Sequence, residues 1–256
     1  MLRLAIFGLF GLAFGSFLTV LVHRVPRKES IVRPGSRCPR CGTPLRTRDN
    51  LPLFGYLLLR GRCRQCGERI SPIYPLMELA SGALFVATAI EFDQDLEAGI
   101  VAPFLSVMVA LAVIDIRHKV LPNRIVYPSL VIAAVAIAIG ALFDGGVDAA
   151  RAAIGFAAYG GSLLLLALLY PAGLGMGDVK LVALIGLVLG SLSLSHVAVA
   201  AGVGIAAGGV FGIGALLVRR AGRKTQMPFG PFLAAGAVVA AFLGPEIADL
   251  YLSTLT

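Results

Sequence analysis

Stretches of predominantly apolar residues recur along almost the whole chain, and no other feature constrains its fold as strongly. A helix needs about 20 such residues to cross the hydrocarbon core of a bilayer. Of the 256 residues 58% are apolar and only 14% are charged, against roughly 25% charged in a soluble domain. The runs lie near residues 4–22, 73–90, 100–114, 125–143, 152–170, 181–194, 197–218 and 231–252. The sequence therefore predicts an all-α polytopic membrane protein with about eight transmembrane helices.

Basic residues are concentrated in one segment, from His23 to Ile70, which holds twelve Lys and Arg residues and three acids. Loops rich in Lys and Arg stay on the cytoplasmic side, so we expect this segment to be cytoplasmic and both termini to lie outside. The alternative, that residues 1–15 are a cleaved signal peptide, would require translocation of the basic stretch. We expect three parts, which are a first transmembrane helix (1–22), a basic cytoplasmic loop (23–71) and a membrane-embedded domain (72–256).

The basic loop also carries every cysteine of the chain, arranged as two C-x-x-C pairs separated by 21 residues. The pairs are Cys38 with Cys41 and Cys63 with Cys66. This pattern is typical of a closed, structural zinc site, in which four thiolates surround the ion and no position is left open for catalysis. Disulfides and a thioredoxin-like redox motif are the alternatives. Cytoplasmic placement argues against the first, and the absence of a surrounding βαβ pattern argues against the second.

Three acidic residues lie in or beside apolar runs, where burial of a charge is costly and an acid is a functional candidate: Glu78, Asp115 and Asp178. An isolated acid at a helix end is often a solvated boundary residue. Asp178 differs because glycines at 173, 175 and 177 precede it and allow another chain to approach the backbone closely. If Asp115 and Asp178 meet in a partly dry site, one keeps a proton while the other stays charged, as in aspartic proteases.

Two other classes of protein are compatible with these residues. An ion-coupled transporter could use the two aspartates as a proton relay, but such groups usually lie near the bilayer midplane rather than at one edge. A non-catalytic membrane scaffold could recruit a partner through its zinc loop, but it would not need paired acids.

The motifs together resemble those of the type IV prepilin peptidases, a family of bacterial membrane aspartyl proteases with a Gly-x-Gly-Asp motif. The resembling segments are Gly15–Leu18, His23–Pro26, Asp49–Pro52, Tyr74–Leu79, Asp115–Pro122, Gly175–Leu181 and Pro228–Leu233. Thr19 and Asn123 stand where asparagine and aspartate are more usual. The resemblance implies that Asp115 and Asp178 are the catalytic pair. We expect substrate binding or support of the site from the residues Gly175, Gly177, Lys180 and Glu78.

The resemblance also implies a substrate, because the family removes short basic leaders from prepilins and pseudopilins at the cytoplasmic face of the bacterial inner membrane. Many members then methylate the new N-terminus with S-adenosylmethionine, for which this sequence shows no separate motif. The basic loop would not attract a basic leader. We therefore expect it to contact anionic lipid headgroups, and we expect no nucleic-acid partner despite the net charge of +8.

Overall fold

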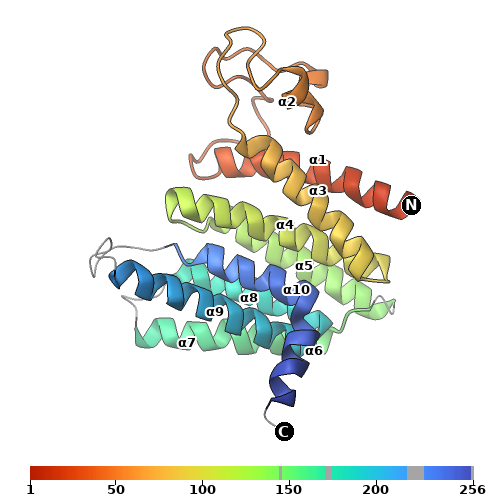
Figure 1. The fold of residues 1–256 in the computed structure, drawn as a ribbon, viewed down its shortest axis with the longest axis vertical. Coiled ribbons are helices and arrows are strands. Elements are labelled where there is room, and N and C mark those ends of the chain that lie inside the picture. The colour runs from red at the N-terminus through yellow and green to blue at the C-terminus, as the bar shows by residue number, and fades with distance from the viewer. Residues whose placement is uncertain (144–145, 171–174, 218–227, 255–256) are drawn as a thin grey trace. The chain divides into compact units, whose positions relative to one another are not determined.

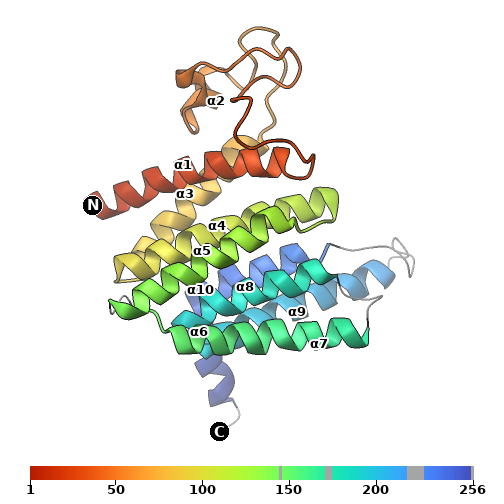
Figure 2. The same cartoon turned by 180° about the vertical axis from the view of Figure 1, so that it is seen from behind.

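The computed structural model describes residues 1–143, 146–170, 175–217 and 228–254. Throughout these ranges the regular structure is helical, apart from two isolated β-bridges in the basic loop. The chain forms two compact units, Met1–Ile90 and Glu91–Thr256. Figures 1 and 2 show the helices of both units from opposite sides. The predicted all-α fold class is confirmed.

Seven helices within the described ranges are long and apolar enough to cross a membrane. They are α1 (Leu2–Arg24), α3 (Ile73–Glu91), α4 (Asp95–His118), α5 (Asn123–Leu142), the continuous rod Ala149–Leu169, α9 (Leu194–Leu217) and α10 (Gly230–Ser253). The rod consists of α6 (Ala149–Gly155), a π-helical turn η2 (Phe156–Gly160) and α7 (Gly161–Leu169). The remaining apolar run, near residues 181–194, forms α8 (Met176–Leu192), which at 17 residues is at the lower limit for a span.

The first unit consists of α1, α3 and the basic loop that joins them. A Cβ atom on Gly11 would lie 2.7 Å from the Cβ of Phe85, and one on Gly15 would lie 2.8 Å from the Cα of Glu78. These glycines therefore allow α1 and α3 to pack with their backbones close together. The loop contains two short helical elements, η1 (Thr47–Asn50) and α2 (Phe54–Leu58).

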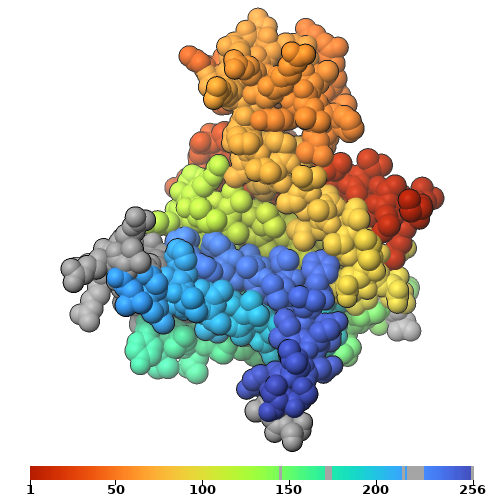
Figure 3. All heavy atoms as spheres, viewed as in Figure 1, coloured from red at the N-terminus to blue at the C-terminus, as the bar shows by residue number. Residues whose placement is uncertain are grey.

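The second unit is built around α8, which contacts α5, α6, α7, α9 and α10. Every residue of α8 from Leu181 to Leu192 is buried. The closest approach is between Gly186 and Gly155, where a side chain on either residue would collide with the backbone of the other. Helices α9 and α10 pack along each other and lie side by side, in light and dark blue, on the face that Figure 3 shows.

The ends of four helices meet at one end of the second unit. Helix α4 ends where Lys119 adopts a left-handed conformation (φ 53°, ψ 40°), and α5 begins after Pro122, so the two helices are antiparallel neighbours. A Cβ on Gly177, in the first turn of α8, would lie 3.1 Å from the Cβ of Leu121 in the α4–α5 turn. The first residue of α10, Gly230, contacts Asp115 in the last turn of α4. This end of the unit carries the candidate site.

Candidate aspartate site and cysteine cluster

Asp115 lies in the last turn of α4 and is almost completely buried, with 5% of its surface exposed. The backbone N–H of Gly230 donates a hydrogen bond to its Oδ2 atom at 2.9 Å. A Cβ atom on Gly230 would lie 2.8 Å from the same oxygen, so only glycine leaves room for the carboxylate in this position. The start of α10 thus fixes the orientation of Asp115, which is 115 positions away in the sequence.

Asp178 is the third residue of α8 and is only partly buried. Its backbone N–H donates to the carbonyl of Gly175 at 3.0 Å. Its Oδ2 atom lies 3.2 Å from the position that a Cβ on Gly175 would occupy, so the carboxylate folds back over the start of the helix. A negative charge is favoured there by the helix dipole and by the free N–H groups of the first turn.

The two carboxylates lie close enough for their charges to interact. One is held in a buried position by a backbone N–H, and the other is more open at the beginning of a neighbouring helix. Two acids in such a partly dry setting can share one proton and exchange it with a reacting water molecule. The arrangement is chemically suited to acid–base catalysis by an aspartate pair.

Gly177 and Lys180 extend the site along α8. Gly177 allows α8 to pack against Leu121, as described above. The Lys180 ammonium group donates to the side-chain carbonyl of Asn123 at 3.1 Å and lies 5.1 Å from the ring centre of Tyr127. Among the residues that the structure describes, Lys180 forms no ion pair with a carboxylate. It therefore joins the first turns of α8 and α5 through neutral partners.

Glu78 belongs to the first unit, where its side chain is buried in α3. Its Oε2 atom accepts a hydrogen bond at 2.8 Å from the backbone N–H of Leu53, a residue with a positive φ of 59°. Leu53 immediately precedes α2. Glu78 thereby connects the membrane helix α3 to the basic loop.

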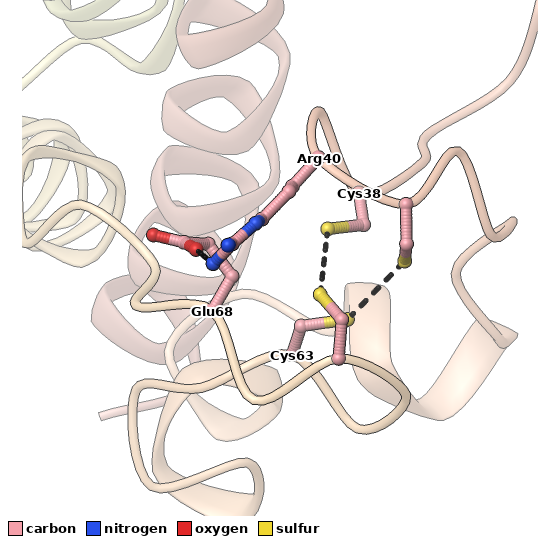
Figure 4. Close-up of polar contacts among 6 residues, drawn as sticks. Cys38, Arg40, Cys63 and Glu68 are labelled. Atoms are coloured by element: carbon pink, nitrogen blue, oxygen red, sulfur yellow. Dashed lines mark hydrogen bonds and ion pairs between the residues drawn. The ribbon is translucent and has the colours of Figure 1, made fainter.

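The four cysteine sulfur atoms form one cluster, all within 4.8 Å of one another. Sγ of Cys38 lies 3.8 Å from that of Cys66, and Sγ of Cys41 lies 3.9 Å from that of Cys63, as the dashed lines in Figure 4 show. A tetrahedral ion with zinc–sulfur bonds of about 2.3 Å places its sulfur atoms about 3.8 Å apart. All four cysteines are free thiols. The cluster can therefore hold a metal ion, and its spacing fits tetrahedral coordination.

Both cysteine pairs use the same backbone design. In each, the glycine after the second cysteine has a positive φ, 71° at Gly42 and 69° at Gly67, and its N–H donates to the carbonyl of the first cysteine. The N–H of Cys38 donates to Thr43, and that of Cys63 donates to Glu68. Only glycine adopts such a φ without strain. The repeated turn points both thiols of each pair to the same side.

The thiols differ in acidity. Hydrogen bonds with the side chain and backbone of Thr43 lower the pKa of the Cys41 thiol to about 6. At Cys66, a backbone hydrogen bond from Glu68 lowers the pKa, but lost hydration and the neighbouring thiols outweigh it and raise the pKa to about 11. The Cys66 thiol therefore keeps its proton at neutral pH unless a cation binds. A bound metal ion would displace the remaining protons.

Two ion pairs brace the loop around the cluster. Arg40 in the first cysteine turn pairs with Glu68 in the second, as Figure 4 shows. Arg64 donates to both oxygens of Asp49, at 2.6 and 3.2 Å, and Asp49 is buried in η1. Neither pair has a signal in the sequence pattern.

The structure shows where each expected site residue lies, and the role of each residue remains a proposal. Asp115, Asp178, Gly177 and Lys180 gather at one end of the second unit, with Gly175 beside Asp178, while Glu78 and the cysteines belong to the first unit. Gly173 lies outside the described residues. The residue that sequence reasoning missed is Gly230. Its only signal was its place between Phe229 and Pro231 in the last motif of the resemblance.

This architecture is that of a multi-spanning membrane protein whose cysteine loop can bind a metal ion. Comparisons with known proteins agree with it. The model of the bacterial peptidase A24 N-terminal domain matches residues 9–92, and that of the type IV leader peptidase family matches residues 102–243. The second match covers more than half of the chain. The protein therefore belongs to the type IV leader peptidase family.

The similar proteins share most of their length with this chain. A prepilin leader peptidase/N-methyltransferase of Bacillus subtilis (strain 168) is 35% identical over 97% of this chain and 98% of its own. Proteins of the same name from Myxococcus xanthus and Pseudomonas aeruginosa are 41% and 33% identical, over 84% and 95% of this chain and 64% and 91% of their own. No solved structure matches the chain significantly.

Proposed function

We propose that this protein cleaves the basic leader from type IV prepilins or pseudopilins by aspartyl-protease chemistry at the cytoplasmic face of the bacterial inner membrane. The observation that carries the proposal is the pairing of Asp115 and Asp178 at one end of a membrane helix bundle, in a member of the type IV leader peptidase family. Family membership disfavours the transporter and scaffold alternatives.

In the proposed reaction, one ionised aspartate takes a proton from a water molecule, and the water oxygen attacks the carbonyl carbon of the scissile peptide. The other aspartate, which is protonated, donates its proton to the carbonyl oxygen. Collapse of the tetrahedral intermediate breaks the carbon–nitrogen bond, and a proton passes to the leaving amine. The Gly230 N–H holds the Asp115 carboxylate in one orientation throughout. Gly175, the exposed residue just before α8, leaves its backbone accessible to an extended substrate beside Asp178, whereas Gly177 lets α8 pack against Leu121.

The new N-terminus is the natural acceptor for a second step. The relatives are named N-methyltransferases as well as leader peptidases, and we propose that this protein also methylates the released amine with S-adenosylmethionine. We propose that the ion in the cysteine cluster is zinc. Its role is structural, because four sulfur ligands leave no open coordination position.

The test uses full-length protein purified in detergent and a synthetic peptide that spans the leader junction of a prepilin. Mass spectrometry should detect the free leader and the trimmed peptide, and added S-adenosylmethionine should make the trimmed product heavier by one methyl group. Trimming without methylation would remove the second activity from the proposal. An intact peptide, with zinc-loaded protein and in native membranes as well, would contradict the proposal as a whole.

A further inference from the structure

An open cavity of about 510 Å³ lies in the first unit, next to the second cysteine turn. Its wall includes Tyr56 of α2 and the three arginines Arg60, Arg62 and Arg69. Ser71 and Pro72, the two residues just before α3, also line it. No acidic residue lines it. Among the residues that the structure describes, none of these three arginines forms an ion pair with a carboxylate. The cavity is therefore strongly positive and lacks a counter-charge of its own.

The backbone forces the three arginines together. Arg62 and Arg69 face each other across an isolated antiparallel bridge at the base of the cysteine turn. Arg60 and Gly61 have positive φ values of 49° and 66°, and the Gly61 carbonyl accepts a hydrogen bond from the N–H of Ile70 at 2.8 Å. Like charges directly opposite each other across a bridge are destabilising. An anion bound between them offsets this repulsion and can receive paired hydrogen bonds from planar guanidinium groups.

The position of the cavity indicates where that anion comes from. Ser71 and Pro72 line the cavity and directly precede Ile73, the first residue of the membrane helix α3. The cavity thus opens at the depth where α3 leaves the hydrocarbon core, which is the level of the lipid headgroups. On α2, which contributes Tyr56 to the wall, the apolar side chains of Phe54, Leu57 and Leu58 are 68%, 68% and 60% exposed. Exposed apolar residues beside arginines are typical of a segment that rests in the membrane interface.

We propose that the cavity between α2, the second cysteine turn and α3 binds the phosphate group of an anionic phospholipid. Arg60, Arg62 and Arg69 hold the phosphate, and the apolar side chains of α2 lie against the acyl chains. The site fixes the basic loop to the membrane surface. The same charge disfavours a cationic ligand, which separates this site from the binding of S-adenosylmethionine with its sulfonium group. The inference is independent of the peptidase chemistry proposed above.

The test is native mass spectrometry on full-length protein in a neutral detergent, titrated with short-chain phosphatidylglycerol, with phosphatidylcholine or with inorganic phosphate. The main variant combines Arg60→Gln, Arg62→Gln and Arg69→Gln. The matched control combines Arg33→Gln, Arg37→Gln and Arg46→Gln, which removes the same charge from exposed positions of the same loop. Each interfacial arginine contributes roughly fivefold to binding of an anionic lipid. The main variant should therefore bind phosphatidylglycerol on the order of 100-fold more weakly, and the control should change it by less than about threefold.

Several outcomes would overturn the assignment. Equally weakened lipid binding in the two triple variants would show a general charge effect of the loop. Equal binding of phosphatidylcholine would show that the site does not distinguish an anionic headgroup from a zwitterionic one. Displacement of the lipid by inorganic phosphate at a similar concentration would make a soluble phosphate compound the ligand. If the main variant loses its metal and hence its fold, Arg60→Gln alone, an exposed position after α2, should still weaken lipid binding about fivefold. No change in that single variant would also refute the site.

Discussion

Replacement of Gly230 by alanine tests how tightly the fold positions Asp115. The added Cβ would lie 2.8 Å from Oδ2 of Asp115, whereas ordinary contacts begin at 3.4 Å, so the carboxylate must move by about 0.6 Å. Gly230 does not have a positive φ, so the backbone accepts alanine and the helix still forms. Misplacement of a reacting group by about 1 Å can reduce the rate roughly 100-fold. We expect leader cleavage to fall about 10- to 100-fold, or about 1.4–2.7 kcal/mol in transition-state stabilisation.

The assay is kcat/KM for cleavage of the leader-junction peptide by purified protein, with thermal stability measured in parallel. The matched control is Gly202→Ala in α9, where an added Cβ meets no atom within 4 Å. It should leave cleavage unchanged. Normal cleavage by the Gly230→Ala protein would show that the position of Asp115 does not matter for the reaction. A large loss of thermal stability would show instead that the substitution acts on the fold.

Three further predictions concern the surroundings of the two sites. Cys63→Ser should lower the metal content, because three thiolates bind zinc far less tightly than four. Elemental analysis of protein purified without chelator measures this content, and full zinc occupancy in the variant would exclude this ligand set. Gly177→Leu should reduce cleavage at least 10-fold because its side chain meets Leu121, and unchanged kcat/KM would refute the close-approach argument. The Arg64 guanidinium holds the pKa of Asp49 below its usual range. This pair therefore stabilises the folded loop fully at pH values above the unfolded-state pKa of Asp49, which is about 3.9. The stabilisation is lost as the pH falls through the lower pKa of Asp49 in the folded state. Protection of the loop against proteolysis should fall in that acidic range in the wild type and be weaker but less pH-dependent in Asp49→Asn; identical pH profiles would contradict it.

The helices and the cysteine cluster follow from local sequence. Each predicted apolar run corresponds to a helix because a chain in lipid must satisfy its backbone hydrogen bonds internally. The apolar run near residues 181–194 marks only part of α8, which begins at Met176, because the first turn carries glycine and charged residues rather than apolar ones. The spacing of the cysteines and the glycines after each pair are sufficient to build the two turns that gather the thiols.

The contacts that complete the candidate site depend on tertiary packing and could not be predicted from local patterns. Asp115 and Asp178 come within range of each other's charge only because α4 ends and α8 begins at the same end of the unit. The Gly230 N–H reaches Asp115 only because α10 packs on α4. Likewise, η1 and α2 carry no strong periodic signal. They form where Asp49 binds Arg64, and where Gly55 leaves room for the Asp49 carbonyl.

The catalytic role of the two aspartates is tested by leader cleavage with the single variants Asp115→Asn and Asp178→Asn, with the double variant and Asp148→Asn measured beside them. Asn keeps the shape of each side chain but removes its acid–base function. Asp148 caps α6 at the opposite end of the second unit, and its N–H donates to the carbonyl of Ser191 at the end of α8. The Asp148→Asn control should keep this helix cap, because asparagine caps a helix as well as aspartate does.

In this experiment, N-terminal mass analysis should find no trimmed prepilin with either single variant, while membrane insertion and metal content stay normal. The double variant should be scarcely worse than either single one, because the two carboxylates act as a unit. Asp148→Asn should cleave normally. Substantial cleavage by the Asp178→Asn protein would contradict the aspartyl mechanism and the catalytic role of this pair.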